Sequence, residues 1–240
     1  MNIFAVLSRV ALLMAFTQGS VLAAESAKTE AANRKIMHEY ASCVVKQKRE
    51  QASDAIVSNS DNATIMRRYP ELVSGACLGR IAGSVQMTFS GDLYRYALAD
   101  ALVNLDFSSQ SQGTFTDRLP LAHLAPLDRV KLNDYLAKTK SKRKRDEAQQ
   151  SFNKQYLVVW LSRYGECVVR NQPVKARQWL LTPPGGPEET SRINDLRLAF
   201  NECLGDGTMK FNRVTMRGTV AINYYRLAMA TVQPAAGKTQ

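Results

Sequence analysis

The chain has 240 residues, of which 45% are hydrophobic and 22% are charged. This balance is typical of a folded globular protein and excludes a wholly disordered chain. With 32 basic against 21 acidic residues the net charge is +11, which favours encounters with anionic partners.

Residues 1–23 have the layout of a secretory signal peptide. A single cation, Arg9, precedes an apolar run from Val10 to Phe16, and the small residue Ala23 provides a cleavage site. The alternative, a membrane anchor, needs about 20 apolar residues, and Gln18 interrupts this run. The sequence therefore predicts a periplasmic or secreted protein with no transmembrane segment after the signal is removed.

A short stretch occurs twice in the remaining chain. Tyr40-Ala41-Ser42-Cys43-Val44-Val45-Lys46 is matched by Tyr164-Gly165-Glu166-Cys167-Val168-Val169-Arg170. Each copy is followed at nearly the same distance by a second cysteine and a Leu-Gly pair, at Cys77 and at Cys203. We therefore expect an all-α protein with two tandem homologous helical repeats that pack together, because small repeat units bury little surface alone. The predicted units are repeat 1 over 24–104, a linker over 105–144, repeat 2 over 145–231 and a flexible tail over 232–240.

The spacing of apolar residues predicts the elements of the first repeat. These are a helix over 27–48 that continues or restarts through 51–57, a helix over 62–79 that Pro70 kinks or splits, a short extended piece over 85–89, and a helix over 93–104 capped by 90–92. The equivalent elements of the second repeat are a long helix over 145–171, a short helix from Pro173 to Leu181, a helix from Pro187 to Leu204, and a last helix that Asn212 caps.

The linker between the repeats contains a strongly basic run. Residues 107–117 are rich in Ser, Gln and Gly, and the segment 120–126 holds two prolines and is expected to lie extended on a helical surface. The basic run then comprises Lys138, Lys140, Lys142, Arg143, Lys144 and Arg145. It is either a contact for an anionic partner or a solvated linker. Since basic residues oppose the dipole at a helix start, the long helix is expected to begin only near Asp146.

Export gives the four cysteines a structural interpretation. In an oxidising compartment an even number of cysteines at matched spacing predicts disulfides, and four cysteines allow three pairings. The duplication favours the local pairs Cys43–Cys77 and Cys167–Cys203. A zinc site would need close pairs such as C-x-x-C, which this sequence lacks, so we expect no metal and no cofactor.

The sequence resembles a family of secreted alphaproteobacterial proteins of unknown function. The resemblance rests on four stretches, namely 163–170, 173–181 with Cys203, Met216-Arg217-Gly218 and Pro120-Leu121-Ala122-His123. It spans most of the chain after the signal, but the first copy departs from it, with Ala41-Ser42 in place of Gly165-Glu166. The resemblance implies export and the two-copy layout, and it implies no activity.

Residues with catalytic potential are few and unpaired in the sequence. A Ser-His or Cys-His nucleophile would need His38 or His123, which are read as a helix-surface residue and as a donor to a backbone carbonyl. Glu166 is expected to form surface ion pairs with Arg163 and Arg170. The remaining acids that a carboxylate-based hydrolase could use, with no spacing that selects a pair, are Glu188, Glu189, Glu202 and Asp206.

We therefore expect a non-enzymatic binding protein with no catalytic residue. Its partner would be an anionic envelope surface or an acidic protein, and export excludes nucleic acid. The alternatives are a carboxylate-based hydrolase and a protein that binds a small ligand in a groove between the repeats. The aromatic residues at helical spacing could line such a groove but are expected in the core. They are Trp160, Tyr164, Trp179, Phe200 and Tyr224.

Overall fold

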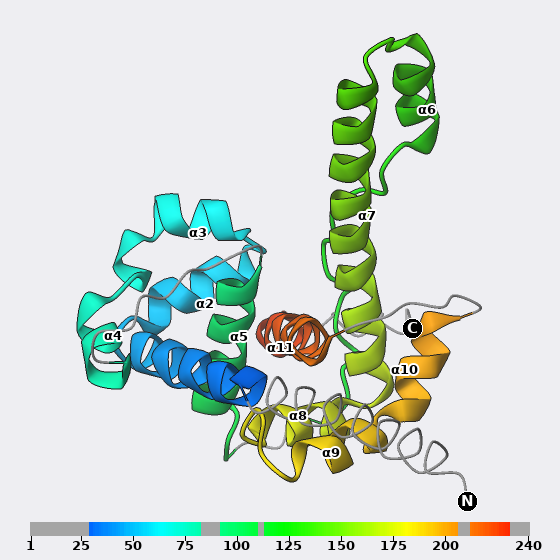
Figure 1. The fold of residues 1–240 in the computed structure, drawn as a ribbon. Coiled ribbons are helices and arrows are strands. Elements are labelled where there is room, and N and C mark those ends of the chain that lie inside the picture. The colour runs from blue at the N-terminus through cyan, green and yellow to red at the C-terminus, as the bar shows by residue number, and fades with distance from the viewer. Residues whose placement is uncertain (1–28, 83–91, 110–112, 206–211, 231–240) are drawn as a thin grey trace, which may run out of the picture.

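A computed structural model describes residues 29–82, 92–109, 113–205 and 212–230 of the chain (Figure 1). Within these ranges the regular structure is helical and contains no strand, which confirms the all-α prediction. The predicted signal peptide, the extended piece over 85–89 and the tail lie outside the described residues.

The first half of the chain contributes a layer of helices around α5. A helix over 29–47 bends at Lys48, and α2 then restarts as predicted. Pro70 splits the next predicted helix, because proline is compatible with the first turn of the short 3-10 helix η1 but not with the middle of an α-helix. The elements are α2 (Arg49–Val57), α3 (Asn62–Arg68), η1 (Pro70–Leu72), α4 (Gly75–Ala82) and α5 (Leu93–Asp106).

The second half begins with a helical hairpin, which the sequence did not predict as such. Its first helix, α6, lies inside the predicted linker, and its second helix, α7, is 30 residues long. The predicted helix over 187–204 is divided at Leu196 into α9 and α10. The elements are α6 (Arg129–Lys138), α7 (Lys142–Asn171), α8 (Pro173–Leu181), α9 (Glu189–Asp195), α10 (Arg197–Leu204) and α11 (Arg213–Met229).

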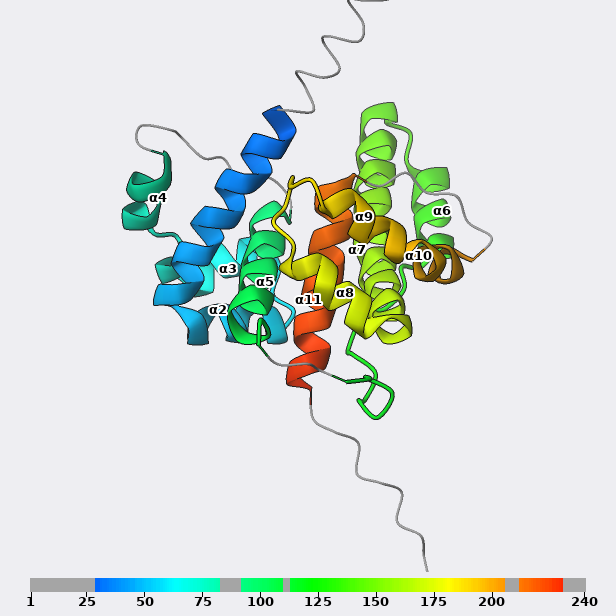
Figure 2. The ribbon, with the colours of Figure 1, turned by 90° about the horizontal axis from the view of Figure 1, so that it is seen from below.

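Helix α11 lies at the centre of the molecule, between α5 of the first half and α7 of the second (Figures 1 and 2). Asn212 caps it as predicted, since its side chain accepts a hydrogen bond from Thr215 N at 2.8 Å. All its residues from Arg217 to Leu227 are buried. A helix that is packed on several sides buries residues all round its axis.

Two glycines allow the other helices to approach α11 closely. A Cβ on Gly218 would lie 2.0 Å from Cγ of Tyr96 on α5. A Cβ on Gly165 of α7 would lie 2.4 Å from Nδ2 of Asn223 and 2.6 Å from Cγ2 of Thr219. Both glycines belong to the stretches on which the family resemblance rests, and their physical role is to bring α5 and α7 against the central helix.

Both predicted disulfides are present. Cys43 pairs with Cys77 and Cys167 with Cys203, with Cα–Cα distances of 5.7 and 5.8 Å, and the described residues include no free cysteine. Each bridge therefore staples a long helix to a short helix of the same half.

The two halves share further features, although the duplication itself stays a prediction. Each half runs from a long cysteine-bearing helix through short helices to a second cysteine-bearing helix and a final long helix. The hydroxyl of Tyr40 accepts from Ser74 N at 3.0 Å, and that of Tyr164 donates to Phe200 O at 3.3 Å. Both partners lie three residues before the second cysteine, although Ser74 precedes α4 and Phe200 lies within α10.

Candidate functional sites

The basic residues gather at the tip of the α6–α7 hairpin, which projects from the body of the molecule (Figure 1). The helix α7 starts at Lys142 and not near Asp146, so the expected later start is wrong. Ser141 explains the difference, because its hydroxyl accepts from Lys144 N at 3.4 Å and caps the helix despite the basic first turn. The tip therefore combines several cations with the positive end of a long helix.

Two of the six basic residues at the tip have partners within the hairpin. Arg143 forms an exposed ion pair with Glu147 at 2.6 Å. Arg145 donates to the carbonyls of Thr139 and Lys140 at 2.8 and 3.1 Å and so closes the turn. The other four residues are exposed and have no acidic partner among the described residues, namely Lys138, Lys140, Lys142 and Lys144.

Aromatic contacts hold the two helices of the hairpin together. The guanidinium of Arg129 on α6 lies 5.9 Å from the ring centre of Phe152 and 5.6 Å from that of Tyr156, both on α7. The two rings are themselves stacked, with their centres 6.2 Å apart. Such cation–π contacts fix α6 against α7 and thereby fix the position of the tip.

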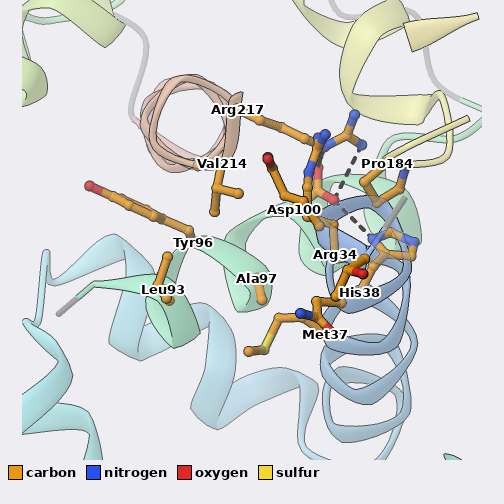
Figure 3. Close-up of a pocket in the computed structure, with 14 residues that line it drawn as sticks. Arg34, Met37, His38, Leu93, Tyr96, Ala97, Asp100, Pro184, Val214 and Arg217 are labelled. Carbon is orange, nitrogen blue, oxygen red and sulfur yellow. Dashed lines mark hydrogen bonds and ion pairs between the residues drawn. The ribbon is translucent and has the colours of Figure 1, made fainter. Parts of the chain in front are cut away.

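A pocket with a volume of about 690 Å³ lies between the two halves of the chain (Figure 3). The helix over 29–47 and α5 form one wall, and α11 and the turn at Pro184 form the other. Its walls are mainly apolar, with Met37, Leu93, Tyr96, Ala97 and Val214 facing the space. Four of its polar residues, Arg34, His38, Asp100 and Arg217, meet at one place, and Thr29, Glu30 and Asn33 also line it.

The polar floor of the pocket is a buried ion network. Arg217 on α11 donates through Nε and Nη2 to the carboxylate of Asp100 on α5, at 3.0 and 3.2 Å. Its Nη1 also lies 3.5 Å from Oε1 of Glu189, which in turn binds Arg34. The network thus joins the first half to the second half through two arginines and two carboxylates.

The carboxylates of this network are held in their ionised form. Burial raises the pKa of Asp100, but Arg217 and the hydrogen bond from His38 lower it by more, so the net pKa is below its ordinary value. Glu189 is similar, since burial raises its pKa while Arg34 and the backbone N–H of Gly185 lower it by more. Both acids therefore act as hydrogen-bond acceptors only.

Arg217 also donates hydrogen bonds to backbone carbonyls at the end of α8. It donates to the carbonyls of Trp179, Leu180 and Thr182 at distances from 2.7 to 3.1 Å. These carbonyls belong to the C-terminal end of α8, where the last helical carbonyls have no partner within the helix. Arg217 is therefore a structural residue that orients Asp100 and the end of α8 beneath the pocket.

His38 also belongs to this network and lines the pocket. Its Nδ1 lies 2.9 Å from Oδ2 of Asp100, and 22% of its side chain is exposed. Because the ionised carboxylate can only accept, Nδ1 carries the proton and donates. His38 is thus a partly exposed residue of a helix, as expected, and Asp100 in addition fixes the orientation of its ring.

His123 fastens the predicted linker to α7. Its Nε2 donates to Oε2 of Glu166 at 2.5 Å, and its Nδ1 lies 2.6 Å from Oγ of Ser162. The expected bond to a backbone carbonyl is therefore wrong. In serine proteases the carboxylate contacts Nδ1 and the serine contacts Nε2, so the two ring nitrogens are exchanged here.

Glu166 is buried and lies at the centre of this second polar cluster. Arg170 is a partner as predicted, with Nε at 2.7 Å, but the expected surface position and the pairing with Arg163 are wrong. The backbone N–H of Leu121 also donates to it, at 3.1 Å. Burial raises the pKa of Glu166, but the hydrogen bonds from His123, Arg170 and Leu121 outweigh burial and lower it to about 2.

The remaining candidate residues are not brought together into a site. Glu188 and Glu202 are exposed, and Asp206 lies outside the described residues. The aromatic residues belong to the core as expected, with Tyr164, Trp179, Phe200 and Tyr224 buried and Trp160 packed against them. In the ranges that the structure describes, no cluster of histidine, cysteine and acidic side chains suits a metal ion, and no helix is long and apolar enough to cross a membrane.

Sequence reasoning missed Asp100 and Arg34. Asp100 lies between Ala99 and Ala101 within the apolar helix α5, and a lone acid in such a stretch is the signal that could have identified it. Arg34 lies among polar residues and carries no such signal. Comparison with models of protein families, with curated protein sequences and with solved structures finds no match for the chain.

Proposed function

We propose that this is an exported, non-enzymatic binding protein that contacts an anionic envelope surface through the tip of the α6–α7 hairpin. The observation that carries the proposal is the gathering of four exposed lysines, with no acidic partner in the part of the chain that the structure describes, at the end of a projecting hairpin. A surface of anionic lipid headgroups would meet this tip before it met the body.

Export is supported by the chemistry of the cysteines. All four cysteines form disulfides within their own half, which is typical of proteins from oxidising compartments. The proposal of a cleaved signal at 1–23 rests on the sequence. In the periplasm or outside the cell the available anionic partners include phospholipid headgroups, acidic polysaccharides and acidic proteins.

Lipid headgroups suit the tip best, because cations and an aromatic side chain occur together there. Tyr135 on α6 is 47% exposed and lies near the lysines in the sequence of the hairpin. Tyrosine favours the boundary between headgroups and acyl chains. Each lysine close to an anionic bilayer contributes about 1 kcal/mol to binding.

The test is co-sedimentation of the disulfide-bonded protein with vesicles that contain phosphatidylglycerol or only phosphatidylcholine. We expect binding to the anionic vesicles that weakens as salt is added. Replacing Lys138, Lys140, Lys142 and Lys144 by glutamine should weaken it by at least about tenfold. Binding to soluble acidic polysaccharide, but not to vesicles, would contradict the lipid assignment.

A control variant separates the position of the charges from the net charge. Lys35, Lys46, Arg67 and Arg80 are exposed on the first half and can be replaced by glutamine, which removes the same number of charges. This variant should bind the anionic vesicles nearly as the unmodified protein does. Equal losses in both variants would mean that net charge, and not the tip, controls binding.

A further inference from the structure

We infer that the pocket between the halves binds a small, mainly apolar molecule that carries one hydroxyl group, and that this hydroxyl donates a hydrogen bond to His38 Nε2. This inference does not depend on the proposed contact with an anionic surface. It rests on the volume and walls of the pocket and on the orientation of His38.

The dimensions and walls of the pocket suit an apolar ligand. Its volume of about 690 Å³ lies in the range of about 300–1,000 Å³ that small-molecule sites occupy. Methionine, leucine, tyrosine, alanine and valine side chains line its sides, and the side chains of Arg34, His38, Asp100 and Arg217 converge at one place (Figure 3). This combination of apolar walls with a few convergent polar groups is characteristic of ligand sites.

The charges around the pocket disfavour an anionic ligand. Arg217 is bound by Asp100, and Arg34 is bound by Glu189, so each cation is already neutralised. A carboxylate ligand would lose its hydration without gaining an unpaired cation, and it would approach the carboxylate of Glu30, which also lines the pocket. A neutral polar group avoids both costs.

His38 selects a hydrogen-bond donor. Asp100 fixes the proton on Nδ1, so in the neutral imidazole Nε2 has a lone pair that can only accept. In the described part of the chain Nε2 has no hydrogen-bond partner, and the ring lines the pocket. An alcohol or phenol hydroxyl is a neutral group that satisfies this acceptor.

The experiment compares two probes that differ only in this group, 4-butylphenol and 4-butyltoluene, by isothermal titration calorimetry with the disulfide-bonded protein. The titrations are made at pH 8, because the inference concerns the neutral imidazole. We expect both probes to bind, because the walls are apolar. The unmodified protein should prefer 4-butylphenol to 4-butyltoluene. This preference, the ratio of the two affinities, should fall by about three- to tenfold in His38→Phe, since Phe keeps an aromatic ring and removes the acceptor.

Two further variants test the location of the site. Ala97→Phe and Val214→Phe introduce rings from opposite walls, and each should weaken both probes by about tenfold or more. Circular dichroism and thermal melting curves identify a wall variant that fails to fold. The other wall variant then tests whether the probes bind in this pocket. The variant without the four tip lysines should bind both probes as the unmodified protein does.

Three outcomes would overturn the inference. The first is that neither probe binds the unmodified protein. The second is that both folded wall variants bind the probes unchanged, which would place binding elsewhere. The third is that His38→Phe keeps the full affinity ratio, which would mean that Nε2 does not recognise the hydroxyl.

Discussion

Arg217 on α11 holds Asp100 on α5 with two hydrogen bonds, of 3.0 and 3.2 Å, in the buried interface between the two halves of the chain. Both side chains are less than 10% exposed, and the carboxylate also accepts a hydrogen bond from Nδ1 of His38. One ion pair therefore connects the packing of the halves with the orientation of the histidine in the pocket.

The first prediction concerns the loss of this cation. Arg217→Met should lower the free energy of unfolding by about 3–5 kcal/mol, because Asp100 and Glu189 would remain buried with one cation fewer. Urea denaturation of the oxidised protein measures the change. Arg143→Gln is the control, since its exposed pair with Glu147 should contribute less than about 1 kcal/mol. Similar effects of the two substitutions would contradict the importance of the buried network.

The second prediction concerns the close approach of α5 and α11. Gly218→Ala should destabilise the fold by about 2 kcal/mol or more, because its Cβ would lie 2.0 Å from Tyr96 Cγ and the helices would have to separate. Gly79→Ala should instead raise the melting temperature slightly. Its Cβ meets nothing within 4 Å, and alanine favours a helix by about 0.5–1 kcal/mol over glycine. Equal melting temperatures for the two variants would contradict the packing of α5 on α11.

The third prediction concerns the dependence of stability on pH. The pKa of Glu166 is about 2 in the folded protein against an ordinary value of 4.5, so the unfolded chain binds more protons between these values. Stability from this group is complete above about pH 5 and is lost as the pH falls toward 2, by roughly 3 kcal/mol. Asp61, Asp100 and Glu189, whose pKa values are also lowered, act in the same direction.

A variant isolates the contribution of Glu166. Glu166→Gln cannot ionise, so its urea midpoint should fall less steeply than that of the unmodified protein between about pH 5 and pH 2.5. Its stability near neutral pH should also be lower, because His123 and Arg170 lose a charged partner. Parallel pH profiles for the two proteins would show that Glu166 does not control the acid sensitivity.

The fourth prediction concerns the disulfides. Removing either bridge, by Cys43→Ala with Cys77→Ala or by Cys167→Ala with Cys203→Ala, should cost about 3–4 kcal/mol, because the unfolded chain gains the freedom of a long open loop. The two losses should be similar, since the loops span 34 and 36 residues. Chemical denaturation measures both, and a loss confined to one half would contradict equivalent roles.

Local signals made the covalent frame and most helix boundaries predictable from the sequence. Matched spacing gave the cysteine pairs, while Pro173 and Asn212 marked helix starts through chemistry that acts within one turn. The start of α7 was predicted wrongly because the prediction considered the basic residues of the first turn and did not consider the cap at Ser141. Even a local rule fails when a second local effect is omitted.

The candidate sites depend on contacts between distant residues, and these could not be predicted. His38 and Asp100 are 62 residues apart, and Asp100 and Arg217 are 117 apart, so no spacing rule relates them. The projection of the basic run required α6, whose apolar residues are mostly exposed and show little periodicity. Composition predicted a basic surface, and the hairpin in the structure shows that the basic run projects from the body of the molecule.

The central position of α11 has a consequence for biosynthesis. The ribosome makes this helix after all the others described, yet α5, α7 and α8 each pack against it. Until Arg213–Met229 has been translated, the faces that these helices turn toward one another stay uncovered. The chain therefore completes its fold only after its synthesis is nearly finished.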